Sequence, residues 1–402
     1  MLAGVVAAAG PGVSDYTATL VRILLLGASA AFLCLLLRPV ALDLDRRAVA
    51  WLVFAFLALL AALLSPKVIS SLARLEVYYA IFVAGLAVGL LLPRCVPGTT
   101  GFALLAIAVV HAGFLAIALQ SAHAAVGKVD PVSAPPYFFN VRHFGYQGFF
   151  GAAAALALGV TDARLRATGT LLATAALFGI VVFGSRGALL AWLVVAAAAF
   201  ALAPDRRVLS AVGVVALAGA LGLAVVSERL DWFNTISLFD RALASRGDMP
   251  SVFDMQSRIE IWNDSLPAIA HRPLLGYGPE GYQISRCCNS NVAQPHNSIL
   301  QVLLEFGVLG LAALTWAAIA LFQPAVRAIT GSARADRDPV GVMALAIIAG
   351  YGAFSLIDGL AYHAVALLNF ALVCAVFLAS RPRGAPDPSA GDGAPATRSR
   401  AS

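Results

Sequence analysis

Long apolar runs dominate this chain and restrict it to proteins that cross a membrane many times. Of its 402 residues, 60% are hydrophobic and only 12% are charged, and the mean hydropathy is +0.87. A soluble domain carries roughly 25% charged residues. Because a helical span needs about 20 apolar residues, the sequence predicts an all-α, polytopic membrane protein. We identify eleven runs of suitable length, at residues 17–37, 48–64, 75–92, 100–120, 144–160, 167–183, 187–203, 208–226, 299–322, 339–356 and 361–379.

Basic residues are distributed unequally between the two sides of this arrangement. With the amino terminus outside, the inner short loops and the tail hold fifteen Lys and Arg residues, against five in the outer short loops. Cytoplasmic loops are enriched in these residues, so the transmembrane region 1–226 is predicted to begin outside, with an outer loop at 121–143. A large outer loop at 227–295 then precedes the carboxy-terminal helices in 296–380. Residues 381–402 are rich in Pro, Gly and Ala and are predicted to be a disordered cytoplasmic tail.

Several classes of function are disfavoured by composition and spacing. The net charge is +6, but no arginine-rich run is interleaved with aromatic residues, so nucleic acid is not an expected partner. The five cysteines are scattered without a metal-binding spacing. A disulfide between the adjacent Cys287 and Cys288 would be strained, and their role is open.

The large outer loop contains two recognisable elements. Apolar residues recur every three or four positions at Met255, Ile259, Trp262, Leu266 and Ile269, which predicts an amphipathic helix lying at the membrane interface. Residues 273–279 hold two glycines and two prolines, which predicts a tight turn. The formal charge of residues 227–295 is −2. An anion site in this loop must therefore use individually placed arginines.

Two arginines are candidates for such an anion site. Arg186 lies in the outer turn at 183–187, directly before an apolar helix whose amino-terminal end points outward. Free N–H groups, the positive end of the helix dipole and a guanidinium fork all favour an anion there. The alternative is a boundary arginine that extends toward the lipid headgroups. Arg258 lies one turn before Trp262 and could bind a second phosphate, or it could be solvated or stacked on Trp262.

His296 lies where the large loop re-enters the membrane, and it is the candidate base. An imidazole can accept a proton from a hydroxyl at neutral pH. The alternative for His296 and for the adjacent Asn297 is helix capping. Glu305 lies about 13 Å farther along a regular helix, too far to orient the His296 ring. Asp358, in the short outer turn at 356–360, is a weaker candidate.

Three motifs occur in order along the chain. They are Ser185-Arg186-Gly187; then Arg258, Trp262 and Pro273-Leu274-Leu275-Gly276-Tyr277-Gly278; then His296-Asn297, Leu300, Glu305, Gly307 and Gly310. With these motifs the chain resembles the O-antigen ligase/polymerase superfamily of bacterial envelope glycosyltransferases. The hydrophobic pattern extends the resemblance to nearly the whole chain, whereas the specific motifs lie within residues 185–310.

The resemblance implies a C-type glycosyltransferase-like architecture in the bacterial inner membrane, usually with twelve spans, and a site on a periplasmic loop with interfacial helices. It implies a glycan donor on undecaprenyl diphosphate and, for a ligase, a lipid A–core acceptor, with no metal and no cofactor. Arg186 and Arg258 match the family's diphosphate-binding arginines, and His296 matches its essential histidine. The substrate-binding residues expected around them are Ser185, Gly187, Trp262, Gly276, Tyr277, Gly278, Asn297 and Arg142.

The favoured function is therefore that of an O-antigen ligase in lipopolysaccharide biosynthesis, with inversion at the anomeric carbon. An O-antigen polymerase shares the arginine–histidine pattern and remains the alternative. A protein O-oligosaccharyltransferase usually has a larger carboxy-terminal region than the 23 residues that follow the last span here. A lipid or glycan transporter would require inverted repeats or matching broken helices, and the sequence contains no internal repeat. The identities of the sugars and the oligomeric state stay open.

Overall fold

The computed structural model describes residues 46–95, 99–124, 141–229, 256–285 and 293–379, which contain helices and no β-strand. The prediction of an all-α fold is confirmed. Ten of the eleven expected spans coincide with helices, and the expected span at 17–37 lies outside the described residues. The long helices are α3 (Arg46–Leu63), α4 (Val68–Cys95), α5 (Thr99–Ala124), α6 (Val141–Thr161), α7 (Arg166–Val182), α8 (Arg186–Leu202), α9 (Arg206–Arg229), α13 (Ser298–Gly331), α14 (Pro339–Ile357) and α15 (Ala364–Ala379).

Many of these helices have the length and composition of membrane spans. Within the described residues, five segments of at least 18 residues qualify: α3, α13, α14, Phe144–Thr161 of α6 and Arg206–Val226 of α9. Shorter apolar helices are α7, α8, α15 and residues Ala103–Ile117 of α5. The chain is therefore a polytopic membrane protein.

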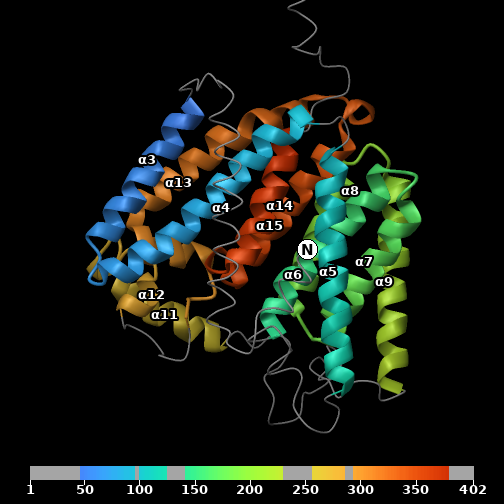
Figure 1. Ribbon diagram of the computed structural model, residues 1–402, viewed down its shortest axis with the longest axis horizontal. Helices are drawn as coiled ribbons and strands as arrows, with labels where there is room; N and C mark the ends of the chain where they lie inside the picture. The colour runs from blue at the N-terminus through green and yellow to red at the C-terminus, as the bar shows by residue number, and fades with distance from the viewer. Residues whose placement is uncertain (1–45, 96–98, 125–140, 230–255, 286–292, 380–402) are drawn as a thin grey trace, which may run out of the picture.

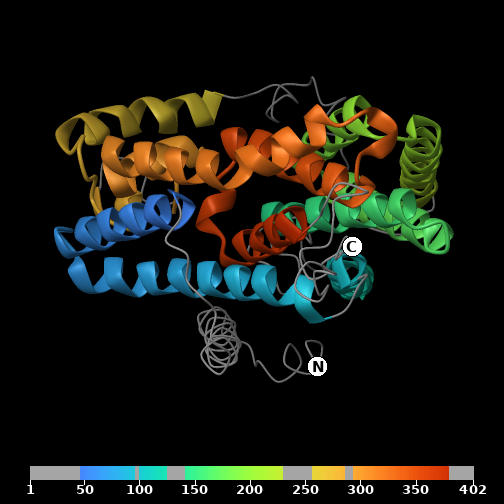
Figure 2. The same cartoon turned by 90° about the horizontal axis from the view of Figure 1, so that it is seen from above.

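The helices form two groups joined by a central pair. In Figure 1, α3, α4 and α13 lie at one end, α5 to α9 lie at the other, and α14 and α15 lie between them. Helix α15 packs against α4, and α14 packs against α8, so the central pair contacts both groups. Figure 2 shows α11 (Gln256–His271) crossing an outer face of the molecule above α13.

Small residues allow the second group to pack closely. Residues 152–158 of α6 are at most 1% exposed, and five of them are alanine. Between α6 and α7, a Cβ on Gly169 would overlap the backbone of Gly159. Such contacts between small residues are the usual basis of helix association in a membrane, where apolar burial alone gives little driving force. They provide a rigid base for the loops at the ends of these helices.

Helix α13 differs from the expected continuous span because it is broken at Gly307. This residue has φ 65° and ψ −169°, a combination available essentially only to glycine. The break separates residues 298–306 from residues 308–331. The second part is about 36 Å long at 1.5 Å per residue, enough to cross the apolar core of a bilayer.

The glycine- and proline-rich turn predicted at 273–279 fills this break. Gly276 and Gly278 both have positive φ, of 66° and 81°. Four backbone hydrogen bonds join the turn to α13: Tyr277 N to Leu304 O (2.8 Å), Gly278 N to Glu305 O (2.9 Å), Val308 N to Pro273 O (2.8 Å) and Leu309 N to Leu274 O (3.2 Å). The turn therefore satisfies helix groups that the break leaves unpaired, as apolar surroundings require.

The segment predicted to be a large outer loop contains the predicted helix, as α11, and this helix ends at His271 just before the predicted turn. Only part of the expected apolar face of α11 is buried. Ile269 packs into a cluster with Ala268 and Tyr277, whereas Ile259 and Leu266 are 43% and 53% exposed. Most of the outer loop at 121–143, the pair Cys287–Cys288, and the predicted tail at 381–402 lie outside the described residues.

Candidate functional site

His296 lies in a buried polar network at the start of α13. Its Nδ1 is 2.7 Å from Oδ1 of Asp358, and the whole residue is 9% exposed. The backbone of His296 has φ 52°, a left-handed conformation that costs a residue with a side chain roughly 1–3 kcal/mol. The backbone N–H of His296 donates to Oε1 of Gln294 at 2.8 Å, which helps to maintain this conformation.

The carboxylate determines which ring nitrogen of His296 carries the proton. An ionised carboxylate only accepts hydrogen bonds, so the 2.7 Å contact requires a proton on Nδ1. The amide of Gln294 also lies 3.0 Å from Nδ1, but the shorter contact with a charged partner is the stronger one. Nε2 then holds the lone pair of the neutral ring. This is the tautomer that a general base needs.

Asp358 is the centre of the network. It follows the last residue of α14 and is 4% exposed. Its Oδ1 also accepts hydrogen bonds from the hydroxyl of Tyr146 and the backbone N–H of Gly359, both at 2.9 Å. A Cβ at Gly359 would collide with Gln294. Asp358 is therefore fixed from α6, α14 and the segment before His296.

Helix α11 contacts this network at two points. An Nη of Arg258 lies 3.7 Å from Oδ2 of Asp358, the oxygen that His296 does not use. Trp262 donates from Nε1 to the carbonyl of Pro295, directly before His296, at 3.0 Å. The expected arginine and histidine therefore share one carboxylate, and Trp262 ties α11 to the chain beside the base.

The Ser185-Arg186-Gly187 motif begins α8, as the sequence indicates. Ser185 is the amino-terminal cap residue, although its side chain makes no capping hydrogen bond. Gly187 faces the last turn of α14, because a Cβ there would lie 2.6 Å from the ring of Phe354. The backbone N–H of Asp358 donates to the carbonyl of Phe354. The motif with Arg186 thus lies against the turn that leads to Asp358, and Gly187 allows this close packing.

Other expected substrate-binding residues have clear structural roles. Gly276, Tyr277 and Gly278 form the turn in the break of α13. Tyr277 is 8% exposed, and its hydroxyl lies 3.3 Å from Nδ1 of His271. Asn297 caps α13 by accepting from the N–H groups of residues 299 and 300. Arg142 belongs to α6, but its side chain lies outside the described part of the chain.

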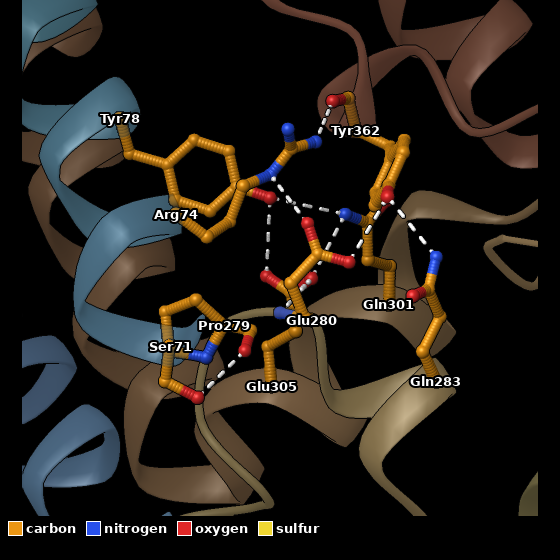
Figure 3. Close-up of polar contacts among 9 residues, drawn as sticks. All are labelled: Ser71, Arg74, Tyr78, Pro279, Glu280, Gln283, Gln301, Glu305 and Tyr362. Atoms are coloured by element: carbon orange, nitrogen blue, oxygen red, sulfur yellow. Dashed lines mark hydrogen bonds and ion pairs between the residues drawn. The ribbon is translucent and has the colours of Figure 1, made fainter. Parts of the chain in front are cut away.

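Glu305 belongs to a second polar cluster and not to the His296 network, as the sequence predicts. Its carboxylate accepts hydrogen bonds from Tyr78 (3.3 Å), from Gln301 (3.2 Å) and from the backbone N–H of Glu280 (3.3 Å). Figure 3 shows these groups together with Arg74, which forms an ion pair with Glu280 at 3.3 Å. The buried acid therefore has the partners that an apolar environment demands.

Sequence reasoning underestimated Asp358 and missed Tyr146 and Gln294. Asp358 does give a signal, namely a carboxylate in a short turn on the same side of the membrane as His296. Tyr146 gives none, because an aromatic residue near the start of an apolar helix is ordinary. Gln294 is close to His296 in sequence, but only the structure shows that its amide reaches the His296 backbone and ring.

Residues 171–315 match the family model described as O-antigen ligase. This region of the chain belongs to the O-antigen ligase superfamily. The superfamily is one of glycosyltransferase-like enzymes, and the matched region contains Arg186, Arg258 and His296 but ends before Asp358. No curated protein matches the chain.

Proposed function

We propose that the protein is an O-antigen ligase that transfers a glycan from undecaprenyl diphosphate to lipid A–core oligosaccharide, with its site on the periplasmic face of the inner membrane. The observation that carries this proposal is the His296–Asp358–Arg258 arrangement, in which the histidine and the arginine lie inside the matched region 171–315 and the carboxylate lies beyond it. A buried carboxylate orients a potential base on one oxygen and lies beside an arginine on the other. The arrangement supplies a base and a cation without a nucleotide-binding loop.

The proposed reaction is a single displacement with inversion. His296 Nε2 accepts the proton of an acceptor sugar hydroxyl as the hydroxyl oxygen attacks the anomeric carbon of the donor. The bond from that carbon to the lipid diphosphate oxygen breaks, and the diphosphate leaves with the electron pair. Asp358 stabilises the imidazolium that forms on His296, as a carboxylate on Nδ1 does in other base-assisted reactions.

The two arginines are proposed to bind the diphosphate. Charge increases on the leaving oxygens in the transition state, and preorganised cations there lower the barrier most effectively in a partly buried site. The side chain of Arg258 is 24% exposed, so it is partly desolvated. Arg186 adds the amino-terminal end of α8, where backbone N–H groups favour anions.

A reconstituted transfer assay tests the function. Purified protein in nanodiscs, supplied with undecaprenyl-diphosphate-linked glycan and lipid A–core, is expected to produce glycan-capped core without added metal or nucleotide. In cells, deletion of the gene is expected to leave uncapped core and accumulated lipid-linked polymer. Core carrying a single repeat unit after deletion would instead indicate the polymerase.

The substitution Arg186→Lys tests whether the geometry of the cation matters. Lysine keeps the charge but cannot form the two parallel hydrogen bonds of a guanidinium. We expect the KM for the donor to rise by roughly tenfold, equivalent to about 1.4 kcal/mol. Arg206→Lys, at the start of α9, is the matched control and should leave this KM unchanged. An unchanged KM in Arg186→Lys would remove Arg186 from the donor site.

The substitution Asp358→Asn tests the orientation of the base. The amide can hold His296 in a hydrogen bond but does not stabilise the imidazolium, and it can favour the wrong tautomer. We expect kcat to fall by roughly 100-fold, within the range for disturbed acid–base catalysis. Acceptor and donor KM should change little. A kcat within twofold of wild type would show that the Asp358 charge has no part in transfer.

A further inference from the structure

An open cavity of about 390 Å³ lies between α4, α12 (Gly281–Ser285) and the short 3-10 helix Leu360–Tyr362. Its volume falls within the range of small-ligand sites, roughly 300–1,000 Å³. The polar residues that line it are Lys67, Ser70, Arg74, Glu280, Gln283 and Tyr362. None of them belongs to the proposed arginine–histidine machinery.

Three lining side chains, Arg74, Glu280 and Tyr362, are held in one arrangement, shown in Figure 3. Arg74 pairs with Glu280 at 3.3 Å, donates to the carbonyl of Tyr362, and stacks on the Tyr362 ring with its guanidinium carbon 4.0 Å from the centroid. The Tyr362 hydroxyl donates to Oε2 of Glu280 at 3.0 Å. Burial raises the pKa of Tyr362, so the hydroxyl keeps its proton for this bond. The lining is thus preorganised before any ligand binds.

The backbone of Glu280 gives an independent indication that this is a functional position. Its φ is 69°, and within the described residues only Glu280 and His296 combine a side chain with a positive φ. Such strain persists only where the surroundings enforce it, and it concentrates at functional sites. The cavity and the proposed base therefore share a rare backbone feature.

The chemistry of the lining matches a sugar better than a lipid chain. A carboxylate, a phenol, a primary amide and an ammonium group offer both hydrogen-bond donors and acceptors, as a polyhydroxylated ring requires. An acyl chain offers no hydrogen-bond partner to any of these groups. The lining contains two cations, Lys67 and Arg74, and one carboxylate, Glu280, and this excess of positive charge adds a preference for a sugar with an anionic substituent.

The cavity lies close to the proposed site of transfer. Tyr362 is four residues after Asp358, and four residues span at most about 14 Å. We propose that this cavity binds a sugar residue of the glycan carried by one of the two lipid-linked substrates. The inference rests on the proposed transferase function. Sugars of the donor and of the acceptor share this chemistry, so the experiment is designed to separate them.

The variant Ser70→Trp tests the proposal by filling the cavity from the exposed surface of α4. Ile69→Trp is the matched control, because Ile69 is 87% exposed and does not line the cavity. Gln283→Ala, which removes an exposed amide from the lining, is a second variant that leaves the core of the protein intact. Binding of lipid-free core oligosaccharide and of lipid-free donor glycan is measured separately by calorimetry in nanodiscs.

The measurements are made in the wild-type background and in His296→Ala, so that binding is read without transfer. We expect Ser70→Trp to raise the Kd of one glycan by about tenfold, Gln283→Ala to raise it by less, and Ile69→Trp to leave it unchanged. The glycan that is affected identifies the substrate whose sugar occupies the cavity. Unchanged Kd values for both glycans in Ser70→Trp and Gln283→Ala would overturn the proposal. Full transfer activity in His296→Ala would instead contradict the proposed mechanism and leave the binding result valid.

Discussion

The variant His296→Ala is expected to abolish glycan transfer while leaving the protein folded. The imidazole is the base of the proposed reaction, and a positioned base contributes roughly 10²–10⁴-fold to rate. Its loss also leaves the buried Asp358 carboxylate without its closest partner, at 2.7 Å. We therefore expect kcat to fall by at least about 10³-fold, measured as glycan-capped core formed by purified protein in nanodiscs.

Two further variants separate chemistry from folding. His296→Asn keeps a polar side chain that tolerates the left-handed backbone of this position, with φ 52°, but it cannot accept a proton. It should be as inactive as His296→Ala and should melt near the wild-type temperature. His271→Ala removes an exposed histidine at the end of α11 whose Nδ1 lies 3.3 Å from the hydroxyl of Tyr277, and it should retain transfer. Near-normal transfer by His296→Asn would exclude His296 as the base.

The variant Gly307→Ala is expected to destabilise the protein far more than the matched methyl addition Gly352→Ala. The backbone of Gly307 lies in a region that is nearly closed to other residues, and a Cβ there would overlap the backbone of Leu274. Backbone strain costs roughly 1–3 kcal/mol and overpacking a similar amount. We therefore expect a loss on the order of 2–6 kcal/mol in the free energy of unfolding, measured by thermal denaturation in detergent.

Gly352→Ala is the control for this change. Gly352 lies in α14 with no atom within 4 Å of the position of an added Cβ. Alanine is the better helix former by about 1 kcal/mol, so this variant should be neutral or slightly stabilising. A melting temperature for Gly307→Ala equal to that of wild type would show that the turn at 273–278 does not fill the break as described.

The break in α13 lies between the two polar regions of the protein, which are the His296 network and the cavity lined by Glu280. The turn that occupies it leads directly to Glu280, whose carboxylate lines the cavity and whose N–H contacts Glu305. Residues 298–306 of α13 begin beside His296 and end with Glu305 and Phe306 at the break. The conformation of Gly307 therefore affects the position of residues 298–306, which follow the proposed base, and the position of the turn that leads to Glu280 in the cavity.

The hydrophobic pattern was sufficient to predict the helices because apolar runs of membrane length have few alternatives. It also located α11 and the turn after it, since amphipathic spacing and paired Gly and Pro residues act locally. It did not reveal the break at Gly307. A glycine within an apolar run is common in membrane helices. The conformation of Gly307 depends on a turn that is distant in the sequence and close only in space.

The sequence by itself determined that the protein is helical and polytopic and that residues 171–315 match the O-antigen ligase family, and it named Arg186, Arg258 and His296 as candidate site residues. Only the tertiary structure decided how they are connected. Asp358 is 62 residues from His296, and Tyr146 is 212 residues from Asp358. Hydrogen bonds at such separations depend on how α6, α11, α13 and α14 pack together. Local periodicity carries no information about that packing, because it records only which face of a helix is apolar.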